Sequence, residues 1–431
     1  MNLREMSARS RDSFYQLSVS PLEQRNQALL ETAEMLEACR EEIFSANLED
    51  LREAEKEGLS APLMHRLKFD REKLSQVQAG LRSLSGLPDP IGHTVFCHEI
   101  TEGLKLYRVT CPIGVLGIIF ESRPDALIQI SSLAVKSGNA ALLKGGREAL
   151  RTNQALIRCV RAALEKAGLP ADAAQLLETR EDVAAMLRED ELIDLIIPRG
   201  SNAFVRYIMD NSRIPVLGHA DGICHVYVDR DADMETARRV ALDSKIQNLS
   251  VCNAEETLLV HEAIAESFLP GFCGLLREAG VEIRGDEAVQ AMVPCRPATE
   301  EDWRTEYLDA ILSIRIVPSL DAAIDHINHY GSHHTDCIIT ENDSAAAVFL
   351  NRVDSAGVYR NVSTRFADGF VYGLGAEVGI ATGKLHARGP MGLDGLTTYK
   401  YKLIGHGQTM ADVKSGRLEY THRVLHEDCP L

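Results

Sequence analysis

The spacing of hydrophobic and polar positions changes along the chain, and its first section, residues 1–75, predicts helices. Apolar side chains recur at helical spacing from Leu29 to Ile43, with charged residues between them. Ser20 is a favourable N-cap and Pro21 suits the first helical position, so a helix is expected to begin here. The charge-dense stretches of this section indicate solvated helix faces rather than a binding surface.

Between residues 91 and 110 the pattern becomes alternating. The segments 94–100 and 104–110 alternate apolar and polar side chains, and Glu102-Gly103 provides a tight turn between them. This pattern predicts a two-stranded ribbon, which is marginally stable alone in water. We therefore expect the ribbon to lie on another part of the protein or on another subunit.

From Pro112 onward, short apolar runs alternate with helical segments, a pattern typical of parallel sheets covered by helices. The first runs expected to form strands are 114–120, 140–144, 174–177, 192–197 and 215–217. After Asp229 the alternation restarts, with strands expected at 256–261, 314–318, 336–340 and 356–359. The two series predict two α/β domains, and such sheets bind ligands at the carboxyl ends of their strands.

The C-terminal part of the chain has weaker patterns. The segment 361–392 is rich in glycine and too irregular for one element. A long loop in a compact domain is usually functional, so this segment is a candidate for the site. Residues 401–431 are expected to form a strand followed by a charged tail.

Composition limits the partners. A chain of 431 residues is long for one core and indicates two domains. Its net charge of −17 at pH 7 would repel a polyanion, which argues against a nucleic-acid partner. No stretch approaches the roughly 18 apolar residues of a membrane span, so no membrane association is expected. The ten cysteines form no C-x-x-C pair, which favours a reduced, cytoplasmic protein without disulfides.

Cys252 is the strongest candidate for chemistry. It lies between a polar stretch and an apolar run, 257–260, that is expected to form a strand. Its sulfur can therefore be presented at the rim of a sheet, where a thiolate is able to attack a carbonyl carbon. Spacing alone leaves open the alternative of a small buried side chain, which is the role of most free cysteines.

Two strand ends combine a cation with open backbone, which suits a phosphate group. The common dinucleotide and P-loop motifs are absent, so each strand end alone also fits an ordinary turn. Together they favour a cofactor cleft. The residues are Lys144, Gly145, Gly146 and Arg147 after one strand, and Arg199, Gly200 and Ser201 after the other.

A third strand end carries charged residues that are unexpected in a structural turn, Glu121-Ser122-Arg123-Pro124. The histidines, in contrast, show no metal-ligand spacing, so no metal site is predicted and a solvated or core position is expected for each. The histidines considered are His219, His225, His333, His334 and His386.

Seven ordered motifs resemble those of the gamma-glutamyl phosphate reductases, a divergent branch of the aldehyde dehydrogenase superfamily. They are collinear from about residue 20 to residue 405, and the motif at 361–377 is the most specific. The motifs cover residues 111–124, 137–146, 197–201, 252–261, 330–336, 361–377 and 385–392. The chain departs from the expected pattern at 248–250 and 381–384, which affects local loop shape without removing a catalytic group.

The resemblance implies NADPH-dependent reduction of L-glutamate 5-phosphate to L-glutamate 5-semialdehyde, the second step from glutamate to proline. It implies an aldehyde-dehydrogenase-like fold with two Rossmann-like α/β domains and a β-ribbon for oligomerisation. The NADP-binding domain would comprise 1–90 and 111–228, the catalytic domain 229–400, and the ribbon and tail 91–110 and 401–431. A homo-oligomer and a transient contact with glutamate 5-kinase are further expectations.

The resemblance also assigns roles to residues. Cys252 would form a thioester. The oxyanion would be stabilised by the backbone amide of Cys252 and by Ser122 or Arg123. Arg123 is equally suited to bind the leaving phosphate. The residues expected at the cofactor are Lys144, Gly145, Arg147, Arg199, Gly200 and Ser201, with Lys144 and Arg147 favouring NADP over NAD. Those expected at the amino-acid end of the substrate are Asn253, Ser363, Thr364 and Arg365, although Arg365 also suits a structural ion pair.

One absence favours phosphate-coupled chemistry. Hydrolytic members of the superfamily carry a glutamate base near the position of 218–222, but no glutamate occurs from Leu192 to Met234. An enzyme that must not hydrolyse its thioester benefits from lacking this base. Two alternatives are a coenzyme-A-acylating aldehyde dehydrogenase, against which the 361–366 match argues, and an inactive oligomeric scaffold.

Overall fold

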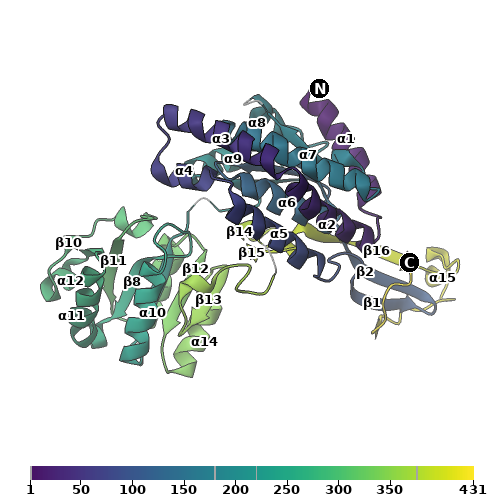
Figure 1. Cartoon of the computed structure of the whole chain (residues 1–431). Coiled ribbons are helices and arrows are strands. Elements are labelled where there is room, and N and C mark those ends of the chain that lie inside the picture. The colour runs from purple at the N-terminus through teal and green to yellow at the C-terminus, as the bar shows by residue number, and fades with distance from the viewer. Residues whose placement is uncertain (1, 179–180, 220, 375–376) are drawn as a thin grey trace.

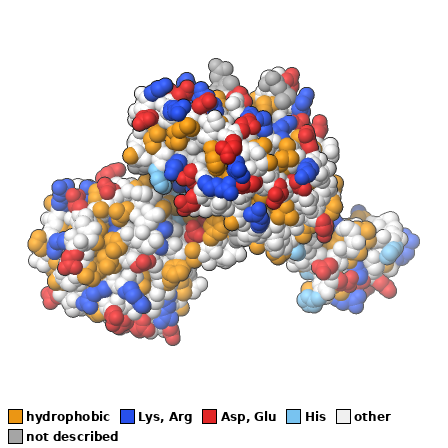
Figure 2. Space-filling view, in the orientation of Figure 1, with side chains coloured by type: hydrophobic (Ala, Val, Ile, Leu, Met, Phe, Trp, Pro, Cys, Tyr) orange, Lys and Arg blue, Asp and Glu red, His pale blue; other side chains and the backbone are white. Residues whose placement is uncertain are grey.

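The computed structural model describes residues 2–178, 181–219, 221–374 and 377–431. The described residues form two helix-covered parallel sheets, a separate antiparallel sheet of four strands and a small antiparallel pair, β14 (Gly379–Ala381) with β15 (Gly389–Met391), which confirms the α/β class (Figure 1). Acidic and basic side chains are interspersed over the face seen in Figure 2. Among the described residues, no helix is both long enough and apolar enough to cross a membrane.

The first sheet has four parallel strands in the order β5-β4-β3-β6. Every residue of the two central strands is buried, because helices cover both faces. The segment 215–217, expected to form a strand, makes only a single bridge, between Ile196 and Val216. The strands are β3 (Val115–Phe120), β4 (Ala140–Lys144), β5 (Ala174–Leu177) and β6 (Leu195–Arg199).

The helices around the first sheet come from two stretches of the chain, one before and one after the segment 94–112, which belongs to the antiparallel sheet. Before it lie α1 (Leu3–Leu17), α2 (Leu22–Ala38), α3 (Arg40–Lys56), α4 (Ala61–Leu67) and α5 (Arg71–Ser85). After it lie α6 (Pro124–Lys136), α7 (Leu150–Lys166), α8 (Glu181–Met186) and α9 (Asn202–Asn211).

The start of α2 differs from the sequence prediction. The helix begins at Leu22 instead of Pro21, and the Ser20 side chain does not cap it. Instead the Ser20 hydroxyl donates to the Leu17 carbonyl at 2.6 Å, so it satisfies the end of α1. The periodic stretch that follows is also divided, because Cys39 separates α2 from α3.

The second sheet has seven parallel strands in the order β10-β9-β11-β8-β7-β12-β13. Its two faces belong to different cores, since Leu258 and Val260 pack in one cluster and Leu259 in another. The strands are β7 (Cys224–Val228), β8 (Glu255–His261), β9 (Glu282–Gly285), β10 (Arg296–Pro297), β11 (Ile311–Val317), β12 (Thr335–Ile339) and β13 (Gly357–Arg360). The helices are α10 (Met234–Ile246), α11 (Glu262–Glu278), α12 (Glu287–Met292), α13 (Leu320–Tyr330) and α14 (Asp343–Arg352).

The expected ribbon is part of a larger antiparallel sheet. Strands β1 (Thr94–Thr101) and β2 (Leu104–Pro112) turn at Glu102-Gly103, where Gly103 has a φ of 72°. Two C-terminal strands add to their outer edges, in the order β16-β2-β1-β17. The added strands are β16 (Thr397–Ile404) and β17 (Arg423–Leu425), and a short helix, α15 (Met410–Lys414), lies between them. The tail expected to be only charged therefore completes this sheet.

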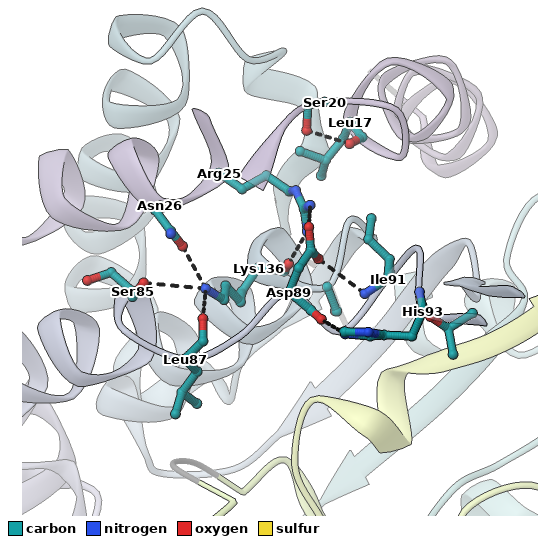
Figure 3. A network of polar contacts seen from close by, with 12 residues as sticks. Leu17, Ser20, Arg25, Asn26, Ser85, Leu87, Asp89, Ile91, His93 and Lys136 are labelled. Atoms are coloured by element: carbon teal, nitrogen blue, oxygen red, sulfur yellow. Dashed lines mark hydrogen bonds and ion pairs between the residues drawn. The ribbon is translucent and has the colours of Figure 1, made fainter. Parts of the chain in front are cut away.

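Two buried cations tie the first α/β layer to the segment that leads into β1 (Figure 3). Arg25 is 1% exposed and pairs with Asp89 at 2.6 Å. Lys136 Nζ donates to Asn26 Oδ1 and to the Leu87 carbonyl, both at 2.7 Å. Burial lowers the pKa of Lys136 to about 8, because the ammonium group has left water.

The Asp89→Asn variant should lower the stability of this part of the protein by about 3 kcal/mol, because Arg25 would be buried without its counter-charge. Urea unfolding measures the loss. The matched control is Glu41→Gln, which removes an exposed partner of Arg40 and should change stability by less than about 0.5 kcal/mol. Equal midpoints for the two variants would contradict a structural role for the Arg25–Asp89 pair.

Candidate active site

Cys252 lies in a turn directly before β8 and is half-buried. The turn presses against Gly222, where an added Cβ would lie 2.1 Å from the Cys252 carbonyl oxygen and 2.6 Å from its Cα. Only a residue without a Cβ leaves room for this approach. The position of the candidate nucleophile therefore depends on Gly222.

The turn is also held from its other side by the segment expected to bind the amino-acid end of the substrate. The Thr364 hydroxyl donates to the Asn253 carbonyl at 2.7 Å, and Asn253 Nδ2 donates to the Ala367 carbonyl at 2.9 Å. Ser363 accepts from Ser244 at 3.3 Å. The structure thus brings Asn253 and residues 363–365 beside Cys252, with Thr364 and Asn253 acting as braces.

Asn361 explains how this segment reaches the turn. Its φ of 54° lies in the left-handed region, which asparagine tolerates better than most residues. Its side chain accepts from Thr340 N at 2.9 Å and donates to the Thr340 carbonyl at 3.1 Å. The chain reverses here after β13, and Arg365 comes to lie with its Nε donating to Gln247 Oε1 at 2.9 Å.

Two histidines lie against the thiol, a neighbour that their spacing in the sequence did not predict, although the core position expected for one of them, His334, is confirmed. The ligand atoms of His219, Cys252 and His334 all lie within 4.8 Å of one another. The two rings meet edge to face, with centroids 4.9 Å apart. Sequence spacing concealed this cluster, because the three residues precede three different strands, β7, β8 and β12, which adjoin one another in the sheet.

The hydrogen bonds of the two rings leave Nε2 available. His219 Nδ1 faces the Ile380 carbonyl at 2.8 Å, so this nitrogen carries the proton and Nε2 keeps its lone pair. His334 is fully buried, and its Nε2 has no hydrogen-bond partner among the residues that the structure describes. Burial lowers the pKa of both imidazoles, so both are neutral near pH 7.

The charges around Cys252 oppose one another. Burial raises the pKa of its thiol to about 12, and the nearby Glu306 carboxylate adds to the effect, whereas Arg199 lowers it. Glu377 Oε1 lies 4.0 Å from Arg199 Nη1, and the negative charge of Glu377 also raises the pKa of the Cys252 thiol. Residues 192–234 contain no glutamate, but Glu306 and Glu377 reach the site from other parts of the chain.

The two sheets contribute opposite edges to the site. Arg199 is the last residue of β6 and therefore lies at a carboxyl edge, as expected for parallel sheets. Cys252, His219 and His334 precede their strands and lie at the amino edge of the second sheet. The candidate site residues thus lie at the carboxyl edge of the first sheet and at the amino edge of the second.

Ser122 has a strained backbone and an engaged side chain. Its φ of 46° is unusual for a residue with a Cβ, and such strain is concentrated at functional sites. Both its amide and its hydroxyl donate to Glu148 Oε1, each at 2.7 Å. Arg123, the next residue, is exposed and lies near Arg199. Arg123 is thus free to meet an anion, whereas Ser122 must first exchange its bonds to Glu148.

Comparisons with known proteins identify the family of this chain. Residues 1–296 match the model of the aldehyde dehydrogenase family. The chain is 56% identical to the gamma-glutamyl phosphate reductase of Pelotomaculum thermopropionicum, over 99% of each chain. It is 54% identical to that of Acetivibrio thermocellus, over the full length of both. The crystal structure of the Thermotoga maritima gamma-glutamyl phosphate reductase matches with a TM-score of 0.93 at 40% identity, covering 95% of this chain and 100% of that one.

The chain belongs to the gamma-glutamyl phosphate reductase family. More distant structures share only the fold. A propionaldehyde dehydrogenase from Rhodopseudomonas palustris matches with a TM-score of 0.63 at 14% identity, over 94% of each chain.

A gamma-glutamyl phosphate reductase uses a nicotinamide cofactor, and the strand ends of the first sheet fit one. The backbone N–H of Ser201, the N-cap of α9, donates a hydrogen bond to Glu121 Oε2 at 3.0 Å, so this N–H already binds an anionic group. At Gly200 an added Cβ would meet Glu121 at 2.5 Å, and at Gly145 it would meet Asn153 at 2.2 Å. Both glycines thus let backbone approach closely.

The Gly222→Ala variant of this reductase should lose about 100-fold in kcat/KM, because the Cβ would displace the nucleophile by an ångström or more. Steady-state assays measure the loss. Gly274→Ala is the matched control, since a Cβ at that position in α11 meets open space and should leave kcat/KM unchanged. Wild-type activity in the Gly222 variant would show that the turn does not depend on this contact.

Alkylation of Cys252 by iodoacetamide should rise about tenfold per pH unit from pH 7 to 9 without a plateau, because the thiolate fraction below the pKa grows in this way. Mass spectrometry of the Cys252 peptide follows the rate. A plateau below about pH 8 would instead indicate a preformed thiolate–imidazolium pair.

Proposed function

We propose that the protein reduces L-glutamate 5-phosphate to L-glutamate 5-semialdehyde and phosphate with NADPH, as the second step from glutamate to proline. The observation that carries the proposal is the convergence on one thiol of two neutral imidazoles and of Arg199 and Arg365. The reduction of an acyl phosphate through a thioester requires a nucleophile, a proton acceptor and cations that bind the phosphate. The curated relatives bear the name of the same activity over their full length.

The first step forms the bond between Cys252 Sγ and the acyl carbon. The thiol is protonated at neutral pH, so a base must take its proton during the attack. We assign this role to His219, whose Nε2 keeps a lone pair because Nδ1 donates to Ile380. The carbon–oxygen bond to phosphate then breaks, and phosphate leaves with the electron pair.

Arginines receive the phosphate in this scheme. Arg199 and Arg123 lie near one another at the ends of β6 and β3, and Arg199 faces the thiol. Two guanidinium groups suit the oxygens of a phosphate, which accept paired hydrogen bonds. The Cys252 amide and Ser122 remain the assigned oxyanion donors, Ser122 on condition that Glu148 releases its hydroxyl.

The other end of the substrate meets the segment after β13. The guanidinium of Arg365 is part-buried near Cys252 and is assigned to the substrate carboxylate. Asn253, Ser363 and Thr364 hold the segment in place through their hydrogen bonds. These three residues are thus assigned mainly to shaping the substrate pocket around Arg365.

A bound cofactor would supply a hydride to the thioester carbon. The carbon–sulfur bond then breaks, the aldehyde leaves, and the sulfur takes back the proton held by His219. The Ser201 amide, flanked by Arg199 and Gly200, would meet its pyrophosphate once Glu121 leaves that amide. Lys144, whose Nζ donates to the Gly145 carbonyl at 2.6 Å, would meet the ribose. Arg147 is exposed beside it, so an added 2′-phosphate finds a cation and NADP is favoured over NAD.

In this proposal the NADP-binding domain comprises 1–90 and the part of 111–228 that precedes β7. Strand β7 lies within the second sheet and therefore belongs, with 229–400, to the catalytic domain, so the boundary expected at 228 moves to before Cys224. The antiparallel sheet, with exposed Tyr399, Tyr401 and Val424, would join subunits of a homo-oligomer. We further propose a cytoplasmic location and a transient contact with glutamate 5-kinase, because an acyl phosphate hydrolyses readily and gains from direct transfer.

The reverse reaction tests the proposal. Purified protein with NADP and glutamate semialdehyde should form NADPH only when inorganic phosphate is present, and Cys252→Ala should abolish the reaction. The His219→Asn variant should lower kcat by about 100- to 1000-fold, the contribution of a general base. His333→Asn is the matched control, because His333 bonds to the Asp354 carbonyl away from the thiol. NADPH formation without phosphate would overturn the acyl-phosphate assignment.

A further inference from the structure

The cluster of His219, Cys252 and His334 has the composition of a metal site as well as that of a proton relay. One thiol and two imidazoles lie within 4.8 Å of one another, at one edge of a rigid parallel sheet. This limit is about 1.3–1.5 Å longer than the spacing of ligand atoms around a tetrahedral Zn²⁺, about 3.3–3.5 Å for bonds of about 2.0–2.3 Å. A small contraction would therefore bring all three atoms onto one ion.

His219 makes the hydrogen bond that a metal-ligating histidine requires. A coordinating histidine normally donates its other ring N–H to a carbonyl or a similar acceptor, which fixes the ring. His219 does so through Nδ1 to the Ile380 carbonyl at 2.8 Å. His334 Nδ1 lies 3.0 Å from Thr335 Oγ1, and its buried Nε2 is without a hydrogen-bond partner among the described residues. That unpartnered, fully buried nitrogen is the second observation that indicates a ligand.

We propose that His219 Nε2, Cys252 Sγ and His334 Nε2 bind Zn²⁺ reversibly and that the bound ion inhibits the enzyme. Binding replaces the proton of the Cys252 thiol with a sulfur–zinc bond and releases that proton to solvent. Water occupies the fourth position, since three protein ligands leave the coordination open. The sulfur can then no longer attack an acyl carbon, and His219 can no longer accept a proton.

The surrounding charges make the site weaker than a structural zinc site. Arg199 and Arg365 lie near the thiol and oppose a dication. Glu306 and Glu377 face the same thiol and offset them in part. Neutral imidazoles bind without losing a proton, and only the thiol must be deprotonated. Reversible inhibition rather than permanent occupancy follows from this balance.

Binding is tested directly with Co²⁺, which takes zinc ligands and reports a thiolate through charge-transfer absorbance. The metal-free wild type should develop this band at one ion per chain, and Zn²⁺ should abolish it. Cys252→Ser should show no band, and His219→Asn and His334→Asn should weaken binding at least about tenfold. His333→Asn should bind as the wild type does, since its ring lies outside the cluster.

A second measurement uses the unaltered chain, in case a variant fails to fold. Zn²⁺ should slow alkylation of Cys252 by iodoacetamide at least about tenfold, and EDTA should restore the rate, while alkylation of half-buried Cys111 stays constant. Equal alkylation with and without zinc, or a cobalt spectrum without a thiolate band, would overturn the site. Both measurements omit substrate and cofactor, so they remain decisive even if the proposed reduction fails.

Discussion

The whole site depends on one steric contact, that between the turn of Cys252 and the backbone of Gly222. The turn approaches so closely that a methyl group at Gly222 would overlap Cys252 itself. This contact places the thiol beside His219, three residues before Gly222, and keeps the turn pressed on the amino edge of β7. On the other side, the Thr364 hydroxyl donates to the Asn253 carbonyl, and the Asn253 side chain donates to the Ala367 carbonyl. A nucleophile held from both sides loses little entropy when substrate arrives.

The surroundings keep the thiol protected until it is needed. Burial and Glu306 raise its pKa to about 12, so at neutral pH the sulfur is a poor target for oxidants and alkylating agents. In the proposed mechanism neutral His219 accepts the proton only when an electrophilic carbon makes its departure favourable. Arg199 belongs to the other sheet, and its charge favours the thiolate.

Local patterns in the sequence were sufficient for most of the fold. Buried strands such as β3 and β4 are continuous apolar runs, and Glu102-Gly103 forms the expected hairpin turn. The family motifs singled out Cys252 and the segment at 363–365, which the structure places side by side, while their roles stay predictions. The prediction failed where structure depends on distant parts of the chain. Strand β17 forms because it pairs with β1. The Ser20 hydroxyl donates to the Leu17 carbonyl at the end of α1 and therefore does not cap α2.

The histidines show most clearly why part of a site is invisible in a sequence. His219 and His334 are separated by much of the second sheet's sequence, and each alone resembles a buried core residue. They meet because β12 and β8 flank β7, so the loops that lead into these three strands share one edge. Strand order is set by crossover connections and by packing of whole helices, not by residues near either histidine. A catalytic cluster built from loops before adjacent parallel strands can thus be recognised only after the order of the strands is known.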